Sequence, residues 1–327
     1  MATFRSLGGG IIATNAPRRI VTITDSYGYH PSAAGSWQSL LTTDMPEATF
    51  YNFYEGSAGF YKAGSSGHNA QGILELHAND IPYHSTITDI VFAMGINDFD
   101  QLSTNVVTAL QSLFTYCKNT YPNARVFLGF AGYSQNMNLN QIEIFPTRVQ
   151  TLIDACNKYN GFYISNIEYI MHDVRNMESD HVHPNATGAQ YIADAVHTTL
   201  NGGTFHYKVA SGSVVTTSSA TYTSDNYYES IDDGIATITI LNNMYDGKTF
   251  TFSGSSFVDF ATVSTPIIFG TCYSTVSCFS SAANSPDVVD ICKYQGNLKV
   301  AWVESGSHTL TGIQIPRYTW SVPTLLV

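Results

Sequence analysis

Two patterns of hydrophobic and polar positions, one typical of strands and one typical of helices, alternate over about the first 200 residues of the chain. Short apolar or β-branched runs predict strands at residues 19–24, 88–94, 125–130 and 162–170. Between them, apolar residues at helical spacing predict helices at 104–119, 146–159 and 187–200. Strands separated by helices are typical of βαβ units. This part therefore predicts a three-layer α/β domain around a parallel sheet.

The pattern changes after Gly203. From residue 204 to residue 327 no helical period is convincing, and short strands such as 235–240, 249–252 and 298–303 alternate with polar turns. Asp246-Gly247 and residues 295–297 are hairpin signals. We expect two domains, residues 1–203 and residues 204–327, the second being an all-β sandwich or small barrel with a carbohydrate-binding or assembly role.

The composition excludes several classes of partner. Only 12% of the 327 residues are charged, about half the usual share of roughly 25%. The net charge is −11 and no basic run is present, so the electrostatic footprint of a nucleic-acid-binding protein is missing. No apolar stretch approaches the roughly 18 residues of a membrane helix, so we expect no membrane insertion. The surface must be covered largely by neutral polar and aromatic groups.

The N-terminal residues do not resemble a signal peptide, because the apolar stretch at residues 8–13 is weak and the arginines follow it. We expect either a cytoplasmic protein or a component of a phage virion, since phage structural proteins reach the exterior without such a signal. The five cysteines form no CxxC pair, so buried thiols are favoured over a zinc site or a disulfide framework.

Three segments of the sequence contain polar residues that suit catalysis. Asp25-Ser26-Tyr27-Gly28 follows the first strand, and Gly95-Ile96-Asn97-Asp98 follows the strand at 88–94. The third segment, residues 180–185, precedes the last helix and contains Asp180 and His183. Parallel α/β sheets place their active sites at the carboxyl ends of the strands. An Asp three residues before a His allows one loop to hold both the imidazole and the carboxylate that orients it toward a serine.

His181 and His183 form a His-x-His pair, which raises the alternative of a metal site. Such a site needs further ligands, and the sequence supplies no obvious ones. We therefore expect neither a metal nor a cofactor.

Together and in this order, the three segments and residues 55–60 (Glu-Gly-Ser-Ala-Gly-Phe) resemble the four sequence blocks of the SGNH hydrolases, also called GDSL-type lipases or acylhydrolases. The resemblance covers about residues 18–202 and implies a flavodoxin-like α/β/α domain and hydrolysis of carboxylic esters. The form with Asp-Ser-Tyr-Gly, Ser36-Trp37 and residues 166–169 (Asn-Ile-Glu-Tyr) is similar to proteins encoded by phages and prophages of Gram-positive bacteria.

The resemblance also implies roles for individual residues. Ser26 is the nucleophile, His183 the general base and Asp180 the carboxylate that orients the imidazole. The oxyanion hole is formed by the backbone N–H groups of Ser26 and Gly59 and by the side chain of Asn97. For Gly59 we expect the lack of a side chain to permit a positive φ and a close approach to substrate.

Thr24 stands where the family usually has glycine. If this position needs a positive φ, threonine strains the turn and misplaces Ser26, whereas an extended backbone accepts threonine at little cost.

Aromatic residues surround the predicted site and suggest stacking on sugar faces. We expect substrate contacts from five of them: Tyr27, Tyr29, Trp37, Phe60 and Tyr133. The leading hypothesis is a serine esterase that removes short acyl groups, above all O-acetyl groups, from a polysaccharide through an acyl-enzyme intermediate.

Two alternatives remain open from the sequence. The first is a phage tail or receptor-binding protein that binds glycan with little or no turnover. Such a protein could be a homotrimer. The second is a lipase or thioesterase, which prefers long acyl chains.

Overall fold

The computed structural model describes residues 17–29, 35–132, 139–253, 256–265, 267, 272–280, 286–294, 297–303 and 307–323. Its N-terminal part is built on a five-stranded parallel sheet with the strand order β2-β1-β3-β4-β5. The strands are β1 (Arg19–Thr24), β2 (Thr49–Tyr54), β3 (Asp89–Gly95), β4 (Arg125–Ala131) and β5 (Phe162–Tyr163). This is the flavodoxin-like order, in which the direction of winding changes between β1 and β3.

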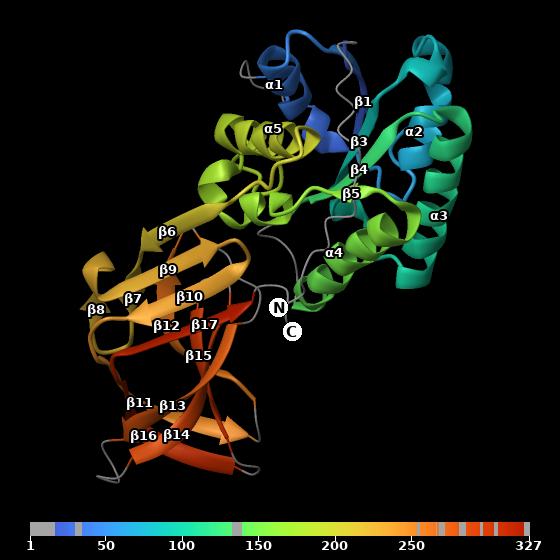
Figure 1. The fold of residues 1–327 in the computed structure, drawn as a ribbon. Coiled ribbons are helices and arrows are strands. Elements are labelled where there is room, and N and C mark those ends of the chain that lie inside the picture. The colour runs from blue at the N-terminus through green and yellow to red at the C-terminus, as the bar shows by residue number, and fades with distance from the viewer. Residues whose placement is uncertain are drawn as a thin grey trace.

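Helices cover both faces of this sheet (Figure 1). On one face α1 (Trp37–Asp44) packs against α5 (Ala186–Leu200), and on the other lie α2 (Ala70–Leu76), α3 (Ser103–Thr120) and α4 (Leu139–Tyr159). Every residue of β3 is buried, because β3 lies inside the sheet and is covered from both sides. The predicted three-layer α/β architecture is confirmed. None of the described helices is both long and apolar enough to span a bilayer.

Several predicted element boundaries were wrong. Helix α4 begins seven residues before the expected start at Pro146, which lies inside the helix (139 against 146). The strand expected over 162–170 ends at Tyr163, because Asn166 adopts a left-handed φ of 65° and a 3₁₀ helix, η5 (Ile167–His172), follows. All six residues of η5 are buried, and apolar periodicity cannot distinguish a buried strand from a short buried helix.

The C-terminal part is all-β, as predicted, and consists of two antiparallel sheets with the orders β17-β10-β9-β6 and β11-β16-β13-β14-β15-β12-β7-β8. The strands are β6 (Lys208–Gly212), β7 (Val214–Thr216), β8 (Thr221–Tyr222), β9 (Tyr227–Asp232), β10 (Ile235–Ile240), β11 (Met244–Ser253), β12 (Val258–Ser264), β13 (Cys272–Ser280), β14 (Pro286–Tyr294), β15 (Asn297–Trp302), β16 (Ser307–Ile315) and β17 (Tyr318–Pro323).

The two hairpin signals had different outcomes. Strands β14 and β15 pair antiparallel across the predicted turn. Asp246-Gly247 instead lies inside β11, where the pairing with β16 shifts register between Asp246 and Thr249. The buried Asp246 carboxylate accepts hydrogen bonds from the backbone N–H groups of Ser218 and Lys248, so the turn-forming residues shape a bulge rather than a hairpin.

Polar contacts join the α/β part to the β part. The Asn166 side chain donates to the carbonyl of Phe205 at 2.7 Å, and the Asn176 amide donates to the Tyr207 hydroxyl at 2.9 Å. Asp173 forms an isolated antiparallel bridge with Ile267. The division of the chain at residues 203 and 204 stays a prediction.

A buried carboxyl in η5 predicts a pH-dependent stability. Burial raises the pKa of Glu168 to about 7, although the Tyr163 hydroxyl donates to its Oε2 at 3.1 Å. Because the folded protein holds this proton more tightly than the unfolded chain, the Glu168 contribution to stability is lost as pH rises from about 4 to 7. We expect Glu168→Gln to stabilise the protein by about 3 kcal/mol more at pH 8 than at pH 4. Urea unfolding at the two pH values measures this, and an equal effect at both would contradict it.

Candidate active site

Ser26 lies at the carboxyl end of β1, at the start of a single 3₁₀ turn, η1 (Ser26–Gly28). Asp25 caps this turn, because its carboxylate accepts the Tyr27 N–H at 2.9 Å. The backbone N–H groups of Gly28 and Tyr29 close the turn on the carbonyls of Asp25 and Ser26, each at 3.0 Å. A serine held in this way presents a half-buried hydroxyl at the edge of the sheet.

Thr24 does not strain this turn. It pairs in register with Tyr54 of β2 and Ala93 of β3 as an ordinary strand residue, and its hydroxyl donates to the Ala93 carbonyl at 2.7 Å. The glycine that the turn requires is Gly28, where an added Cβ would lie 2.2 Å from the Thr24 methyl carbon. Of the two expectations for Thr24, the extended backbone is therefore confirmed.

His183 lies in the loop before α5 and connects Ser26 to Asp180. Its Nε2 is 2.9 Å from the Ser26 Oγ, and its Nδ1 is 2.6 Å from the Asp180 Oδ2. The other oxygen of Asp180 accepts the backbone N–H groups of Val182 and His183 at 2.9 and 3.0 Å. The loop is therefore folded around the carboxylate, and the three predicted catalytic side chains form a continuous hydrogen-bonded chain.

The same bonds keep Asp180 ionised. Partial burial acts to raise its pKa, but the hydrogen bonds from the His183 side chain and from the backbone of His183 and Val182 outweigh it and lower the pKa to about 2. An ionised Asp180 fixes the proton of the neutral imidazole on Nδ1 and leaves Nε2 as an acceptor for the Ser26 hydroxyl.

Tyr27 supports the histidine loop and does not face a substrate, which corrects one predicted contact. Its side chain is 1% exposed, its hydroxyl donates to the Val182 carbonyl at 2.7 Å, and its ring meets the His183 ring edge-on at 6.0 Å. Tyr27 thus packs against the ring of His183.

Asn97 follows β3 in a second 3₁₀ turn, η4 (Ile96–Asp98), beside the Ser26 turn. Its Nδ2 donates to the Ala58 carbonyl at 2.9 Å and lies 3.4 Å from the Asp25 Oδ2. Burial raises the pKa of Asp25 to about 7, against hydrogen bonds from the Tyr27 and Gly95 N–H groups. One amide proton of Asn97 is committed to the Ala58 carbonyl, while the other makes only a long contact.

Gly59 does not fit the predicted oxyanion role, because its N–H donates to the Lys62 carbonyl at 2.9 Å. Its φ is not positive either. The position needs glycine because an added Cβ would lie 2.4 Å from a carboxylate oxygen of Asp98. That buried carboxylate accepts three successive N–H groups, from Phe60 (2.6 Å), Tyr61 (3.2 Å) and Lys62 (2.9 Å). Asp98 thus holds the loop after β2 against the turn after β3.

The four remaining residues predicted to contact the substrate differ in their exposure. Trp37 is completely buried and Phe60 is 1% exposed, so both belong to the core and these two predictions were wrong. Tyr29 is 58% exposed and lies 6.1 Å, centroid to centroid, from the 49% exposed Tyr54. Tyr133 lies outside the described residues. An aromatic surface beside Ser26 therefore exists, but Tyr29 and Tyr54 form it.

Among the described residues, no group of three or more His, Cys, Asp or Glu side chains is arranged to hold a metal ion.

No protein-family model matches this chain, and no curated protein is significantly similar to it in sequence. Solved structures do resemble it at low identity. A member of the lipolytic protein G-D-S-L family from Veillonella parvula is 18% identical, with 55% of this chain and 96% of that chain covered and a TM-score of 0.44. A family two carbohydrate esterase from Clostridium thermocellum, in complex with cellohexaose, is 17% identical over 57% and 64% of the two chains, also with a TM-score of 0.44.

Phospholipase A1 from Streptomyces albidoflavus is 15% identical, with 57% of this chain and 99% of that chain covered and a TM-score of 0.38. At such identities and scores, function has to be argued from the site itself.

Proposed function

We propose that this protein is a serine esterase that removes short acyl groups from a carbohydrate. The observation that carries the proposal is the hydrogen-bonded chain from Ser26 Oγ through both nitrogens of His183 to Asp180, located where two parallel strands end. A protein that only binds glycan has no need of a base aligned on a serine hydroxyl.

The proposed reaction has two halves, and His183 serves both. His183 Nε2 accepts the Ser26 proton as Oγ bonds to the carbonyl carbon, and it returns this proton to the leaving alcohol when the ester bond breaks. A water then repeats the sequence on the acyl-enzyme: it gives a proton to Nε2, its oxygen bonds to the acyl carbon, and Ser26 leaves with the proton. Asp180 stabilises the imidazolium in each half.

In this proposal, two donors stabilise the oxyanion. As the first residue of η1, Ser26 has an N–H with no acceptor in its own helix. The Asn97 amide, which comes from the neighbouring turn, contributes the proton that makes only the 3.4 Å contact with the Asp25 Oδ2. Neutral donors suit this role because they stabilise the charge that develops on oxygen without adding a charge of their own.

We expect Asn97→Ala to lower kcat by about 10²- to 10³-fold. Because the side chain also binds the Ala58 carbonyl, kcat and KM for an acetyl ester have to be separated. Loss of an oxyanion donor lowers kcat with little change in KM, whereas displacement of the loop changes both. A kcat within fivefold of the wild-type value would remove Asn97 from the proposed oxyanion hole.

Two features support a neutral sugar as the part of the substrate that carries the ester. The exposed rings of Tyr29, three residues after Ser26 in the sequence, and of Tyr54 in β2 offer a stacking surface. The chain has few charged residues, which suits a neutral glycan. A source in phages and a role in a virion stay predictions.

Acetate release from a panel of O-acetylated polysaccharides tests the proposal, with p-nitrophenyl esters of increasing chain length measured in parallel. We expect turnover of acetyl esters and a fall in kcat/KM as the acyl chain grows. A preference for long chains would favour the lipase or thioesterase alternative. No turnover of any ester would favour glycan binding without catalysis.

A further inference from the structure

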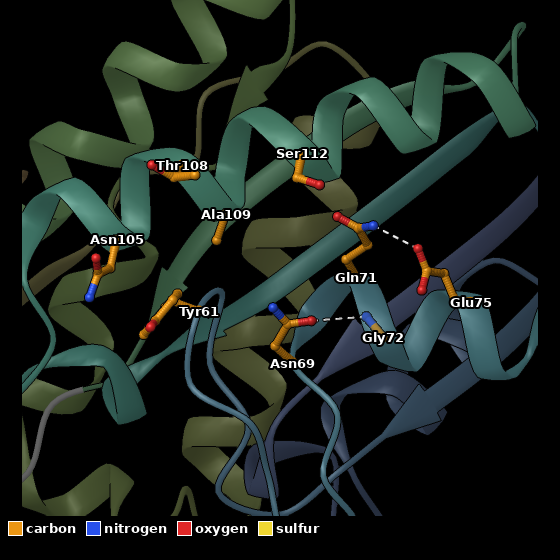
Figure 2. Close-up of a pocket in the computed structure, with 9 residues that line it drawn as sticks. All are labelled: Tyr61, Asn69, Gln71, Gly72, Glu75, Asn105, Thr108, Ala109 and Ser112. Carbon is orange, nitrogen blue, oxygen red and sulfur yellow. Dashed lines mark hydrogen bonds between the residues drawn. The ribbon is translucent and has the colours of Figure 1, made fainter.

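A groove between α2 and α3 is separate from the residues that the proposed reaction uses. A hollow of about 370 Å³ lies between the two helices and is adjoined by a second one of about 500 Å³, and the two share Gln71, Thr108 and Ser112. Figure 2 shows side chains of α3, namely Asn105, Thr108, Ala109 and Ser112, facing Tyr61, Asn69 and Gln71 across the first hollow.

The chemistry of the lining restricts the ligand. Amide and hydroxyl side chains dominate both hollows, and neither is lined by a Lys, an Arg or a large aliphatic residue. A phosphate or a sulfated ligand would find no cation, and a lipid chain or an amphipathic helix would find no apolar strip. Glu75 is the one charged side chain among the lining residues, and Gln71 donates to it at 2.6 Å. Such a surface suits a neutral ligand rich in hydroxyl groups.

Several lining groups are available to such a ligand. In the described structure the Asn105 amide and the Ser112 hydroxyl have no protein hydrogen-bond partner, and each faces the first hollow. Tyr61, which lines the first hollow, is 42% exposed, and Tyr116, which lines the second hollow, is half-buried. Aromatic faces combined with free amides and hydroxyls are the groups that bind sugars by stacking and hydrogen bonding.

The groove starts at the same edge of the sheet as the catalytic groups. Helix α2 follows the loop after β2, α3 follows the turn that contains Asn97, and each therefore begins where its strand ends. Tyr61 belongs to the segment whose N–H groups bind Asp98, the residue next to Asn97.

We propose that this α2–α3 groove binds a neutral glycan as a second subsite, so that a polymer is held while one of its esters is cleaved at Ser26. Only one part of this inference, the cleavage of an ester at Ser26, rests on the proposed function. Binding of the glycan itself requires no turnover.

The test uses the full chain and measures Kd for neutral hexasaccharides without acyl groups, namely cellohexaose, xylohexaose and maltohexaose, by calorimetry. We expect at least one to bind the wild-type protein. Tyr61→Ala, which removes the exposed ring, and Ala109→Phe, which fills the groove, are each expected to raise Kd about tenfold or more. The matched control is Val107→Phe, which introduces the same side chain at a residue of α3 that is 47% exposed and does not line the groove.

The control is expected to keep the wild-type Kd and the wild-type rate on p-nitrophenyl acetate. Failure of all three sugars to bind the wild-type protein would overturn the groove proposal, as would wild-type affinity in both groove variants. Hydrolysis of p-nitrophenyl acetate by the wild-type protein is scored separately. Its absence would overturn the esterase proposal, while the Kd values alone decide the groove.

Discussion

Replacement of Ser26 by alanine is expected to reduce ester hydrolysis by at least about 10⁴-fold, because the only hydroxyl within hydrogen-bonding distance of His183 Nε2 in the described structure is lost. Release of p-nitrophenol from the acetyl ester measures the effect. The folded structure should be unaffected, since the Ser26 turn is closed by backbone groups and by Asp25, and not by the Ser26 hydroxyl.

Two further variants make this prediction specific. Ser39→Ala removes an exposed serine on α1 and is expected to retain wild-type activity. Adding His183→Ala to Ser26→Ala is expected to cost almost nothing more, because a nucleophile and its base act as one unit. A Ser26→Ala protein with more than a tenth of the wild-type rate would show that the reaction occurs elsewhere.

Asp180→Asn is expected to lower kcat by about 10³- to 10⁴-fold with little loss of stability. The asparagine carbonyl can still accept the N–H groups of Val182 and His183, so the loop keeps its shape. Its amide then donates to His183 Nδ1, which forces the ring proton onto Nε2. With a proton on Nε2, the imidazole cannot accept one from Ser26.

Asp154→Asn is the matched control, because this exposed carboxylate on α4 bonds only to Gln150 in the described structure. Measuring kcat and the thermal midpoint for both variants separates a catalytic effect from unfolding. An Asp180→Asn variant with a kcat within tenfold of the wild-type value would contradict the assigned role of the carboxylate.

The hydrogen-bonded chain of Ser26, His183 and Asp180 was predictable because its signals are local. Asp180 and His183 are three residues apart, and Ser26 directly follows a strand that its β-branched residues make evident. The parallel sheet then brings the ends of β1 and β3 together, which requires only the strand order. The sequence thus shows the polar side chains themselves, and the parallel sheet that it predicts brings the strand ends that carry them together.

The supporting residues were not predictable, because their roles depend on packing. Tyr27 and Phe60 look like surface aromatics near a site, yet the fold buries both. Gly59 suggested an approach to substrate, whereas the close neighbour is Asp98, whose importance depends on three N–H groups from a different loop. Helices α1 and α2 also escaped prediction, since at eight and seven residues they are too short for a clear period.

Reaction with a fluorophosphonate, which bonds covalently to activated serines, tests the central claim most directly. Digestion and mass spectrometry then identify the labelled residue. We expect stoichiometric labelling on Ser26 in the wild-type protein, and almost none in Ser26→Ala or His183→Ala. An unlabelled wild-type protein, or a label on another residue, would contradict the assignment of Ser26 as a nucleophile activated by His183.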